Sequence, residues 1–241
     1  MVKNENLNPV NCPECESWAN CPFQNLTSME LKFLYRGKTI LHFEKHQTIF
    51  SENIKPLGIY CVKKGKVKIT TTGTQPGMSQ ILHISTAGEV LGIDDVLSES
   101  LMHYNAETLE DTEVCLIDKE TFLALLENNP TLARDLLIRA SHAVKDRDST
   151  ISRLGHYSVR ERTAQTLLSL TSVHGKKTHA GIKLDLNLSR RELAQLAGTV
   201  PESVVRVLSD FKKEGLIGMR KREITILNQM GLTRVYAPRM Q

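Results

Sequence analysis

The strongest constraint on this fold is a change of pattern near Asp118. Before it, short runs rich in β-branched and aromatic residues alternate with glycines, which is typical of strands in an antiparallel β-roll or jelly roll. Strands are predicted over 48–50, 58–62, 66–71, 80–84 and 113–117. After Asp118, apolar residues recur every three or four positions, which predicts mainly helices. The predicted fold class is therefore α+β, with the β-rich part first.

The helical part begins with a predicted helix over 119–127 and continues with a long one that starts near Pro130 and ends at Gly155. A seam of roughly coiled-coil period runs along this second helix. Its members are Leu132, Leu136, Ala140, Ala143, Arg147, Ile151 and Leu154. One helix cannot cover its own apolar stripe, so the seam predicts a homodimer helix. The alternative is a helix packed on its own barrel. Two copies of Arg147 would repel across a dimer unless Asp146 or Asp148 pairs with them, which predicts weak, conditional dimerisation.

A further helix is predicted over 159–173, followed by a loop over 174–181, and then by the most structured stretch of the sequence, 188–208. Ser189 and Glu192 have capping-box spacing, Gly198 supplies a turn, and Pro201 fits the first turn of a second helix. Two helices that meet at a short glycine-containing turn are typical of a helix-turn-helix, whose second helix enters the major groove of double-stranded DNA. An αα-hairpin without a DNA role is the alternative.

The predicted DNA contacts fall into three groups. Base-reading residues lie early on the second helix, phosphate-holding residues lie at the helix N-termini, and a basic hairpin tip over 215–227 forms a wing. In that order, the residues are Pro201, Glu202, Val205 and Arg206; Ser189, Arg190 and Ser203; and Arg220, Lys221 and Arg222.

The charge distribution agrees with a polyanionic partner. Residues 189–241 contain ten Lys/Arg and five Asp/Glu, so the remaining 188 residues hold 21 of the 31 basic and 22 of the 27 acidic side chains. The net charge of +4 therefore comes entirely from the C-terminal end. A solvated charged face is the alternative. No Ser–His–Asp set, P-loop or carboxylate pair stands in a convincing context, so the chain is not expected to be an enzyme.

No apolar run approaches the roughly 20 residues that span a bilayer, and residues 1–11 lack the basic and apolar regions of a signal peptide. We therefore expect a cytoplasmic protein without membrane contact. The predicted domains are a cysteine-rich segment over 1–25, a β-roll sensor domain over 26–128, a dimerisation helix over 129–156 and a winged helix-turn-helix domain over 157–241. The sensor domain is expected to begin with a short helix, because Thr27 and Glu30 have capping-box spacing.

Three of the five cysteines, Cys12, Cys15 and Cys21, lie within ten residues. In a reducing cytosol, such clusters bind metal more often than they form disulfides. Structural zinc and iron–sulfur clusters both take four ligands, commonly thiolates. The fourth ligand would come from Cys61 or Cys115, which both lie in strand-like segments. Spacing selects neither the fourth cysteine nor the metal.

The glycine-rich segments 58–69 and 87–92, the long helix and the winged helix-turn-helix together resemble the CRP/FNR superfamily over nearly the whole chain. The cysteine triplet has the spacing of the FNR type, and Cys115 stands where that type places its fourth ligand. This resemblance implies a 4Fe–4S cluster on Cys12, Cys15, Cys21 and Cys115, with Cys61 outside the ligand set. It also implies an oxygen-responsive activator that contacts RNA polymerase and whose cluster nitric oxide can also attack. Asp94 and Asp95 are one candidate for the polymerase contact, although a solvated turn is the favoured interpretation of this pair.

The same resemblance argues against a cyclic nucleotide. Cyclic-AMP receptors hold the phosphate with an Arg-Ser pair, whereas this chain has 103–106, His-Tyr-Asn-Ala, in that place and no arginine between Gly88 and Lys119. Glu202 and Arg206 match the family's readers of G·C steps, which predicts a TTGA-N6-TCAA-like palindrome, with the base facing Val205 left open. Two alternatives remain: a regulator with structural zinc and a small-molecule effector other than cyclic AMP, and an electron-transfer protein on the same scaffold.

Overall fold

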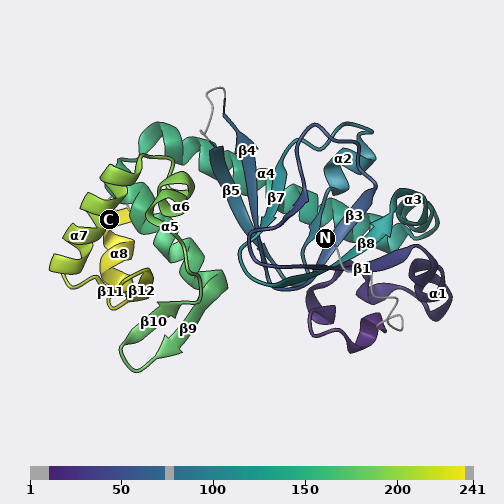
Figure 1. Cartoon of the computed structure of the whole chain (residues 1–241), viewed down its shortest axis with the longest axis horizontal. Helices are drawn as coiled ribbons and strands as arrows, with labels where there is room; N and C mark the ends of the chain where they lie inside the picture. Colours follow the sequence, from purple (N-terminus) through teal and green to yellow (C-terminus); the bar gives the residue numbers. More distant parts are fainter. Residues whose placement is uncertain (1–10, 74–78, 237–241) are drawn as a thin grey trace. The chain divides into compact units, whose positions relative to one another are not determined.

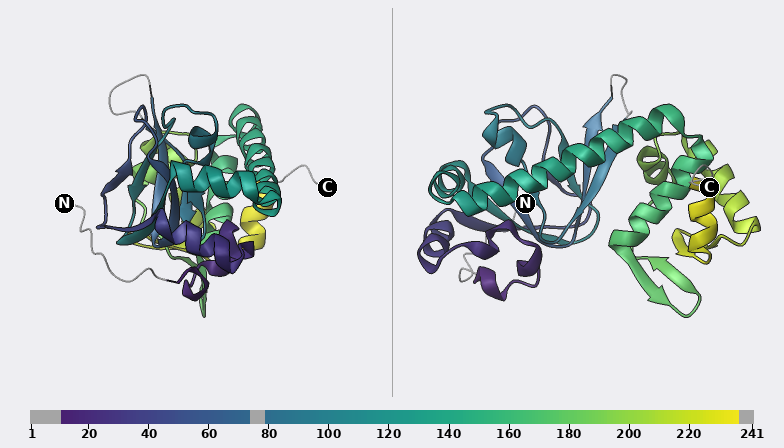
Figure 2. Two further views of the ribbon diagram at one scale, coloured as in Figure 1. Left: turned by 90° about the vertical axis from the view of Figure 1, so that its right-hand side faces the viewer. Right: turned by 180° about the vertical axis from the view of Figure 1, so that it is seen from behind.

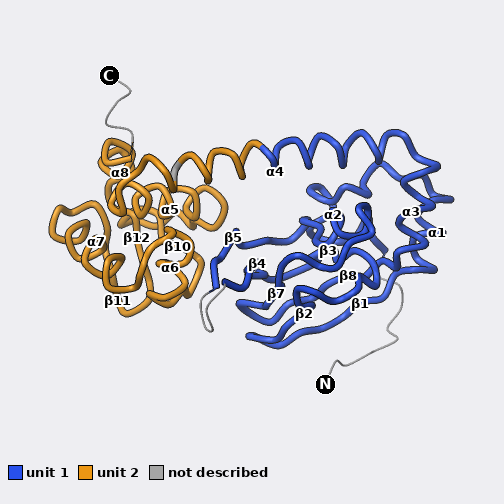
Figure 3. Tube along the Cα trace, turned by 90° about the horizontal axis from the view of Figure 1, so that it is seen from above, with its two compact units in different colours: residues 1–144 blue, residues 145–241 orange. Residues whose placement is uncertain are grey.

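The computed structural model describes residues 11–73 and 79–236. The predicted cysteine-rich segment 1–25 is therefore seen from Asn11 onward, and the predicted DNA-binding domain up to Tyr236. The chain forms two compact units, residues 1–144 and 145–241 (Figure 3). Within the described residues, no helix combines the length and the apolarity that a membrane span requires.

Unit 1 is built on two antiparallel sheets (Figure 1), as the predicted β-roll class requires. In spatial order, the first sheet contains β1 (Lys38–Phe43), β8 (Thr112–Asp118), β3 (Gly58–Lys64) and β6 (Val90–Leu91). The second contains β2 (Thr48–Phe50), β7 (Asn105–Thr108), β4 (Lys66–Thr72) and β5 (Ser79–Thr86). The prediction missed β1, β6 and β7. Strand β6 is only two residues long, and three of the four residues of β7 (Asn, Ala and Glu) are depleted in strands, so both depend on pairing with neighbours.

Both faces of strand β3 are buried. Successive side chains point to opposite faces, so they enter two different cores. Tyr60 and Val62 point into the space between the sheets, in a core with Phe50 and Tyr104. Ile59 and Cys61 belong to a second core on the other face of the first sheet, together with helical residues and the N-terminal segment. The free sulfur of Cys61 therefore lies outside the barrel interior, on the helical side.

Helices and short 3₁₀ turns cover this outer face. The turns are η1 (Cys12–Glu14), η2 (Trp18–Asn20) and η3 (Pro22–Asn25); the helices are α1 (Ser28–Arg36), α2 (Ile93–Leu97), α3 (Lys119–Asn128) and the start of α4 (Pro130–His156). The predicted capping box of α1 is confirmed, because the Thr27 hydroxyl accepts from the Glu30 amide and the Glu30 carboxylate accepts from the Thr27 amide. The long helix after Pro130 is also present as predicted (Figure 2).

The structure corrects the predicted seam on α4. Leu132 and Leu136 are 2% and 7% exposed and belong to the core of unit 1, so they are not free to form a dimer contact. Ala143 is exposed but lies off the stripe that the exposed apolar residues define. That stripe keeps alternating steps of three and four: Leu137, Ala140, Val144, Arg147, Ile151 and Leu154, all exposed. The predicted seam was displaced by about one residue at its start because sequence alone does not show which leucines the barrel already covers.

The acidic pair of α2 is a second correction. A solvated turn was the favoured interpretation of Asp94 and Asp95, but Asp95 is 2% exposed within a short helix. Its carboxylate lies 2.7 Å from Nδ1 of His103 and accepts from the hydroxyl of Ser100. A buried carboxylate needs such partners, so Asp95 has a structural role in this loop.

Unit 2 is a helical domain with one small sheet among the described residues, in the order β11, β12, β10, β9. Its elements after α4 are α5 (Val159–His174), β9 (Gly175–Thr178), β10 (Gly181–Leu184), α6 (Arg190–Leu196), α7 (Pro201–Lys213), β11 (Ile217–Arg220), β12 (Glu223–Ile226) and α8 (Gln229–Tyr236). The loop predicted over 174–181 is instead largely a hairpin, because Ile182 on β10 pairs with Ile226 on β12 and extends the wing into a sheet.

Candidate metal centre and nucleic-acid interface

The N-terminal segment winds its three cysteines through successive tight turns. The amide of Cys15 donates to the carbonyl of Cys12, that of Trp18 to Cys15, and that of Cys21 to Trp18. The segment is held down because Phe23, 2% exposed, enters the core on the outer face of the first sheet. The amide of Cys12 also donates to the phenol oxygen of Tyr35 on α1, at 2.9 Å. Local turns and one aromatic anchor therefore fix where the three thiols lie.

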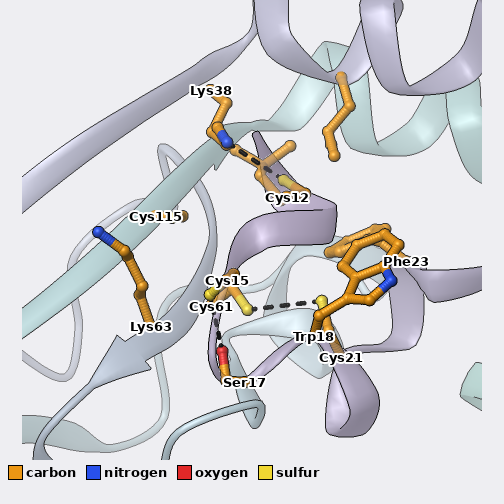
Figure 4. Close-up of a pocket in the computed structure, with 12 residues that line it drawn as sticks. Cys12, Cys15, Ser17, Trp18, Cys21, Phe23, Lys38, Cys61, Lys63 and Cys115 are labelled. Atoms are coloured by element: carbon orange, nitrogen blue, oxygen red, sulfur yellow. Dashed lines mark hydrogen bonds between the residues drawn. The ribbon is translucent and has the colours of Figure 1, made fainter. Parts of the chain in front are cut away.

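The strand cysteines meet this segment at a single cavity. Cys61 on β3 and Cys115 on β8 are direct partners across the antiparallel pair, so their side chains share one face of the sheet. All five cysteines of the chain line the cavity, together with Trp18 and Phe23 (Figure 4). The structure thus brings Cys115, distant in the sequence, to the N-terminal Cys12, Cys15 and Cys21, and places Cys61 beside them.

Charge and burial set the state of these thiols. The ammonium group of Lys38 donates to the sulfur of Cys12 at 3.1 Å, and Lys63 also lines the cavity. Burial raises the pKa of the Cys115 thiol to about 11. The hydrogen bond between the sulfurs of Cys21 and Cys61 lowers the pKa of Cys21, and the same bond together with burial raises the pKa of Cys61 well above its ordinary value. Ionisation is therefore easier at Cys21 than at either strand cysteine.

This donor set fits a thiolate-bound group. Iron–sulfur clusters and structural zinc both take four soft sulfur ligands, and four cysteines from two separate parts of the chain face one cavity here. Two lysines beside them offset the negative charge that such a group carries with its thiolates. Sequence analysis did not identify Lys38 or Lys63, because their approach to the cysteines follows from strand register and leaves no local pattern.

The second candidate site is the helix-turn-helix of unit 2. Gly198 has a φ of +61°, which explains glycine at the turn between α6 and α7. Arg162 on α5 holds this turn: Nε donates to the carbonyl of Ala197 at 2.9 Å and Nη2 to that of Gly198 at 3.0 Å. No sequence pattern indicated this role for Arg162. On α7, Val204, Leu208 and Phe211 are buried, so the opposite face of the helix is left for a ligand.

The predicted contact residues differ in how accessible they are. Glu202, Val205 and Arg206 are exposed on the outer face of α7, and Arg220, Lys221 and Arg222 are exposed at the wing tip, whereas Pro201 and Ser203 are half-buried. The two half-buried residues at the start of α6 are already engaged. Ser189 caps the helix, and Nη2 of Arg190 donates to the carbonyl of Lys221 at 3.1 Å, which braces the wing. Phosphate contacts from Ser189 and Arg190 stay predictions.

Ser189→Ala is expected to lower the free energy of unfolding of unit 2 by about 0.5–2 kcal/mol, because the Ser189 side chain accepts from the Glu192 amide and completes a capping box. Chemical denaturation followed by circular dichroism measures the change. Ser209→Ala, a half-buried serine within α7, is the matched control and should cost less. Equal losses in the two variants would contradict a specific capping role.

Each of the two units contains a region that matches a known domain family. Residues 40–129 match the cyclic nucleotide-binding domain, and residues 161–235 match the Crp-like helix-turn-helix domain. The transcriptional activator protein Anr of Pseudomonas aeruginosa is 27% identical over 236 residues, which cover 96% of this chain and 94% of that protein. The fumarate and nitrate reduction regulatory protein of Escherichia coli K12 is 26% identical over 230 residues, covering 94% and 90%.

Solved structures show the same fold. A CooA variant from Carboxydothermus hydrogenoformans superposes with a TM-score of 0.71 at 19% identity, covering 97% of this chain and 98% of that one. FixK2 from Bradyrhizobium japonicum superposes with a TM-score of 0.72 at 24% identity, covering 82% and 96%. The predicted fold class and resemblance are therefore confirmed: the chain combines a cyclic nucleotide-binding domain with a Crp-like helix-turn-helix domain, as transcription regulators of the CRP/FNR type do, which act by binding DNA and are not enzymes.

Proposed function

We propose that this protein is an oxygen-responsive transcription regulator that holds a 4Fe–4S cluster on Cys12, Cys15, Cys21 and Cys115 and binds DNA as a homodimer. Its similarity to Anr and to the fumarate and nitrate reduction regulator over more than 90% of the chain supports this function. The observation that carries the proposal is the cavity: three cysteines from the N-terminal turns and one from β8 converge there, beside two lysines.

When bound, the cluster would link the N-terminal turns to β8. Oxygen or nitric oxide would break this link by attacking the cluster. The chain itself continues from Cys115 to the dimer helix in three short steps. Strand β8 ends at Asp118, whose carboxylate caps α3 by accepting from the Thr121 amide at 2.7 Å. Helix α4 begins at Pro130, and Leu132 and Leu136 pack into the same core as Cys21 and Cys61. The thiol cavity and the start of α4 therefore share one packed core.

Dimerisation would use the exposed stripe of α4. Leu137, Val144 and Ile151 are 69%, 53% and 69% exposed and stand seven residues apart, which is the spacing of one coiled-coil position. Arg147 lies on the same stripe, between Val144 and Ile151. Bringing two Arg147 side chains together would cost energy unless Asp146 or Asp148 pairs with them, so the dimer is expected to be weak and to form when a further free-energy term favours it.

Arg147→Leu is expected to shift the monomer–dimer equilibrium of the cluster-free protein toward dimer, because it removes the repulsion and extends the apolar stripe. Analytical ultracentrifugation over a concentration series measures the constant. Lys145→Leu is the matched control: it also exchanges an exposed cation for leucine, one position off the stripe. An unchanged constant for Arg147→Leu, or an equal shift for Lys145→Leu, would show that Arg147 does not limit dimerisation.

The proposed DNA site is a palindrome of the TTGA-N6-TCAA kind, whose half-sites would lie one helical turn apart. Exposed Glu202 and Arg206 on α7 support this site because glutamate can accept from cytosine N4 and arginine can donate to guanine O6 and N7 in the major groove. Selection of binding sites from a random duplex pool tests it. Enrichment of paired TTGA-like half-sites is expected, and a pool without such a half-site would contradict the assignment. RNA polymerase is the partner proposed for an activator, and the exposed Asp94, rather than the buried Asp95, is the candidate contact at α2.

We also propose that the β-roll does not use a cyclic nucleotide, although it matches that domain family. Aromatic side chains occupy the core between the sheets: the ring of Phe50 lies 5.0 Å from that of Tyr60 and 5.4 Å from that of Tyr104. In the segment where cyclic-AMP receptors carry Arg-Ser, His103 is paired with the buried carboxylate of Asp95. A buried carboxylate repels a phosphate, so both features oppose cyclic-nucleotide binding.

A further inference from the structure

Cys61 has no part in the proposed ligand set, yet it lies deep in the same cavity. Its sulfur is 4.0 Å from that of Cys21, and both residues are only 7% exposed. The other cysteines of the N-terminal segment have different nearest polar partners, since Cys12 contacts Lys38 and Cys15 contacts the hydroxyl of Ser17. The fifth cysteine therefore stands directly against one proposed ligand.

The two sulfurs belong to segments that differ in their freedom to move. Cys61 lies on β3, hydrogen-bonded to β8 on one side and to β6 on the other. Cys21 lies between the short turns η2 and η3, with extended backbone. A disulfide requires an S–S distance of about 2.05 Å, so the sulfurs must approach by roughly 2 Å. A change in the Cys21 side chain and its turn supplies this movement more easily than a change in the paired strand.

We propose that Cys21 and Cys61 form a disulfide when the cluster-free protein meets a peroxide. The Cys21 thiolate attacks hydrogen peroxide, the O–O bond breaks, and sulfenic acid forms at Cys21 while the departing hydroxide takes a proton to become water. The Cys61 thiol then attacks the Cys21 sulfur, the S–S bond forms and the S–O bond breaks, and the leaving hydroxide accepts the thiol proton as a second water. Two thiols are oxidised and one peroxide is reduced. A water-sized oxidant suits a pair so well buried.

The consequence for regulation rests on the proposed function, because it requires Cys21 to be a cluster ligand. With Cys21 bound to Cys61, the ligand set Cys12, Cys15, Cys21 and Cys115 is one thiolate short. The oxidised protein would therefore stay without a cluster until a thiol reductant released Cys21. This adds a second condition to the oxygen response: the regulator would recover only where both oxygen is absent and thiols are reduced.

Peptide mapping of the full-length, cluster-free chain tests the bond itself. Cleavage after glutamate separates all five cysteines, because Glu14, Glu16 and Glu30 divide the N-terminal three and Glu52, Glu89, Glu113 and Glu120 isolate Cys61 and Cys115. After treatment with one equivalent of peroxide and alkylation, the peptide with Cys21 is expected to be joined to that with Cys61, and dithiothreitol should part them. Cys15→Ala is the matched control and should keep this link. Cys61 found alkylated, or Cys21 joined to another cysteine, would overturn the proposal.

Anaerobic iron uptake tests the consequence. Peroxide-treated wild-type protein should fail to take up iron and sulfide until dithiothreitol is added. In Cys61→Ala treated in the same way, a sulfenic-acid reagent such as dimedone should label Cys21, because no thiol at position 61 resolves the sulfenic acid. If treated wild-type protein takes up iron before dithiothreitol is added, the bond does not control assembly. If fully reduced wild-type protein takes up no cluster, the proposed function fails, while peptide mapping still decides whether the disulfide forms.

Discussion

Cys115→Ala is expected to remove the cluster completely, and with it high-affinity DNA binding without oxygen. Of the four proposed ligands, Cys115 alone comes from the sheet, so its loss leaves three thiolates for a group that takes four and frees the N-terminal turns from β8. Iron and acid-labile sulfide per chain, measured after anaerobic reconstitution, should fall from a full complement to background. The substitution removes one half-buried sulfur, so the fold itself should survive.

Cys61→Ala is the matched control for this experiment. It removes a thiol from the strand position directly opposite Cys115 and from the same cavity, yet cluster content and anaerobic DNA binding should stay at the wild-type level. The reverse result, with Cys61→Ala colourless and Cys115→Ala loaded, would assign the fourth ligand to Cys61. Loss in both variants would show that the sheet face as a whole, rather than one thiol, is required.

Arg206→Ala is expected to weaken binding to a TTGA-type palindrome by about 1–3 kcal/mol per half-site, because it removes a side chain that can bond O6 and N7 of one guanine. Arg206 is exposed on the face of α7 opposite the buried Val204 and Leu208, so stability should change little. Fluorescence anisotropy against the palindrome and against duplexes altered at each position gives the affinity and the specificity. Preference at one guanine should disappear.

Arg222→Ala at the wing tip separates base reading from phosphate contact. It removes the same kind of side chain from an exposed position that is predicted to meet the backbone. Its affinity should fall about equally on all duplexes, and the slope of log K against log salt should decrease in magnitude by about 1 per subunit, or about 2 for the dimer. If Arg206→Ala instead weakens all duplexes equally, α7 does not read the guanine through that residue.

The features predicted well from sequence are those that local chemistry determines. Thr27 and Ser189 begin helices because side-chain capping is decided within four residues. Gly198 marks the turn between α6 and α7 because few other residues accept its positive φ. The cysteine triplet likewise occupies successive turns that contain their own hydrogen bonds.

The features that were missed depend on distant partners. Strands β9 and β10 form because β12 offers an edge to Ile182, which no pattern in 174–181 reveals. The stripe on α4 shifts because the barrel core takes Leu132 and Leu136. Spacing left Cys61 and Cys115 equivalent, and family resemblance set Cys61 aside; strand register then placed both on one face of one cavity.

The central claim is that the four cysteines hold an oxygen-labile cluster that controls DNA binding. Its most direct test is DNA binding by protein purified without oxygen, measured with visible absorbance before and after exposure to air. A brown protein that binds the TTGA-type palindrome, and that loses colour and affinity together in air, is the predicted result. A colourless protein with one zinc per chain, or a cluster that bleaches while DNA affinity stays constant, would contradict the claim.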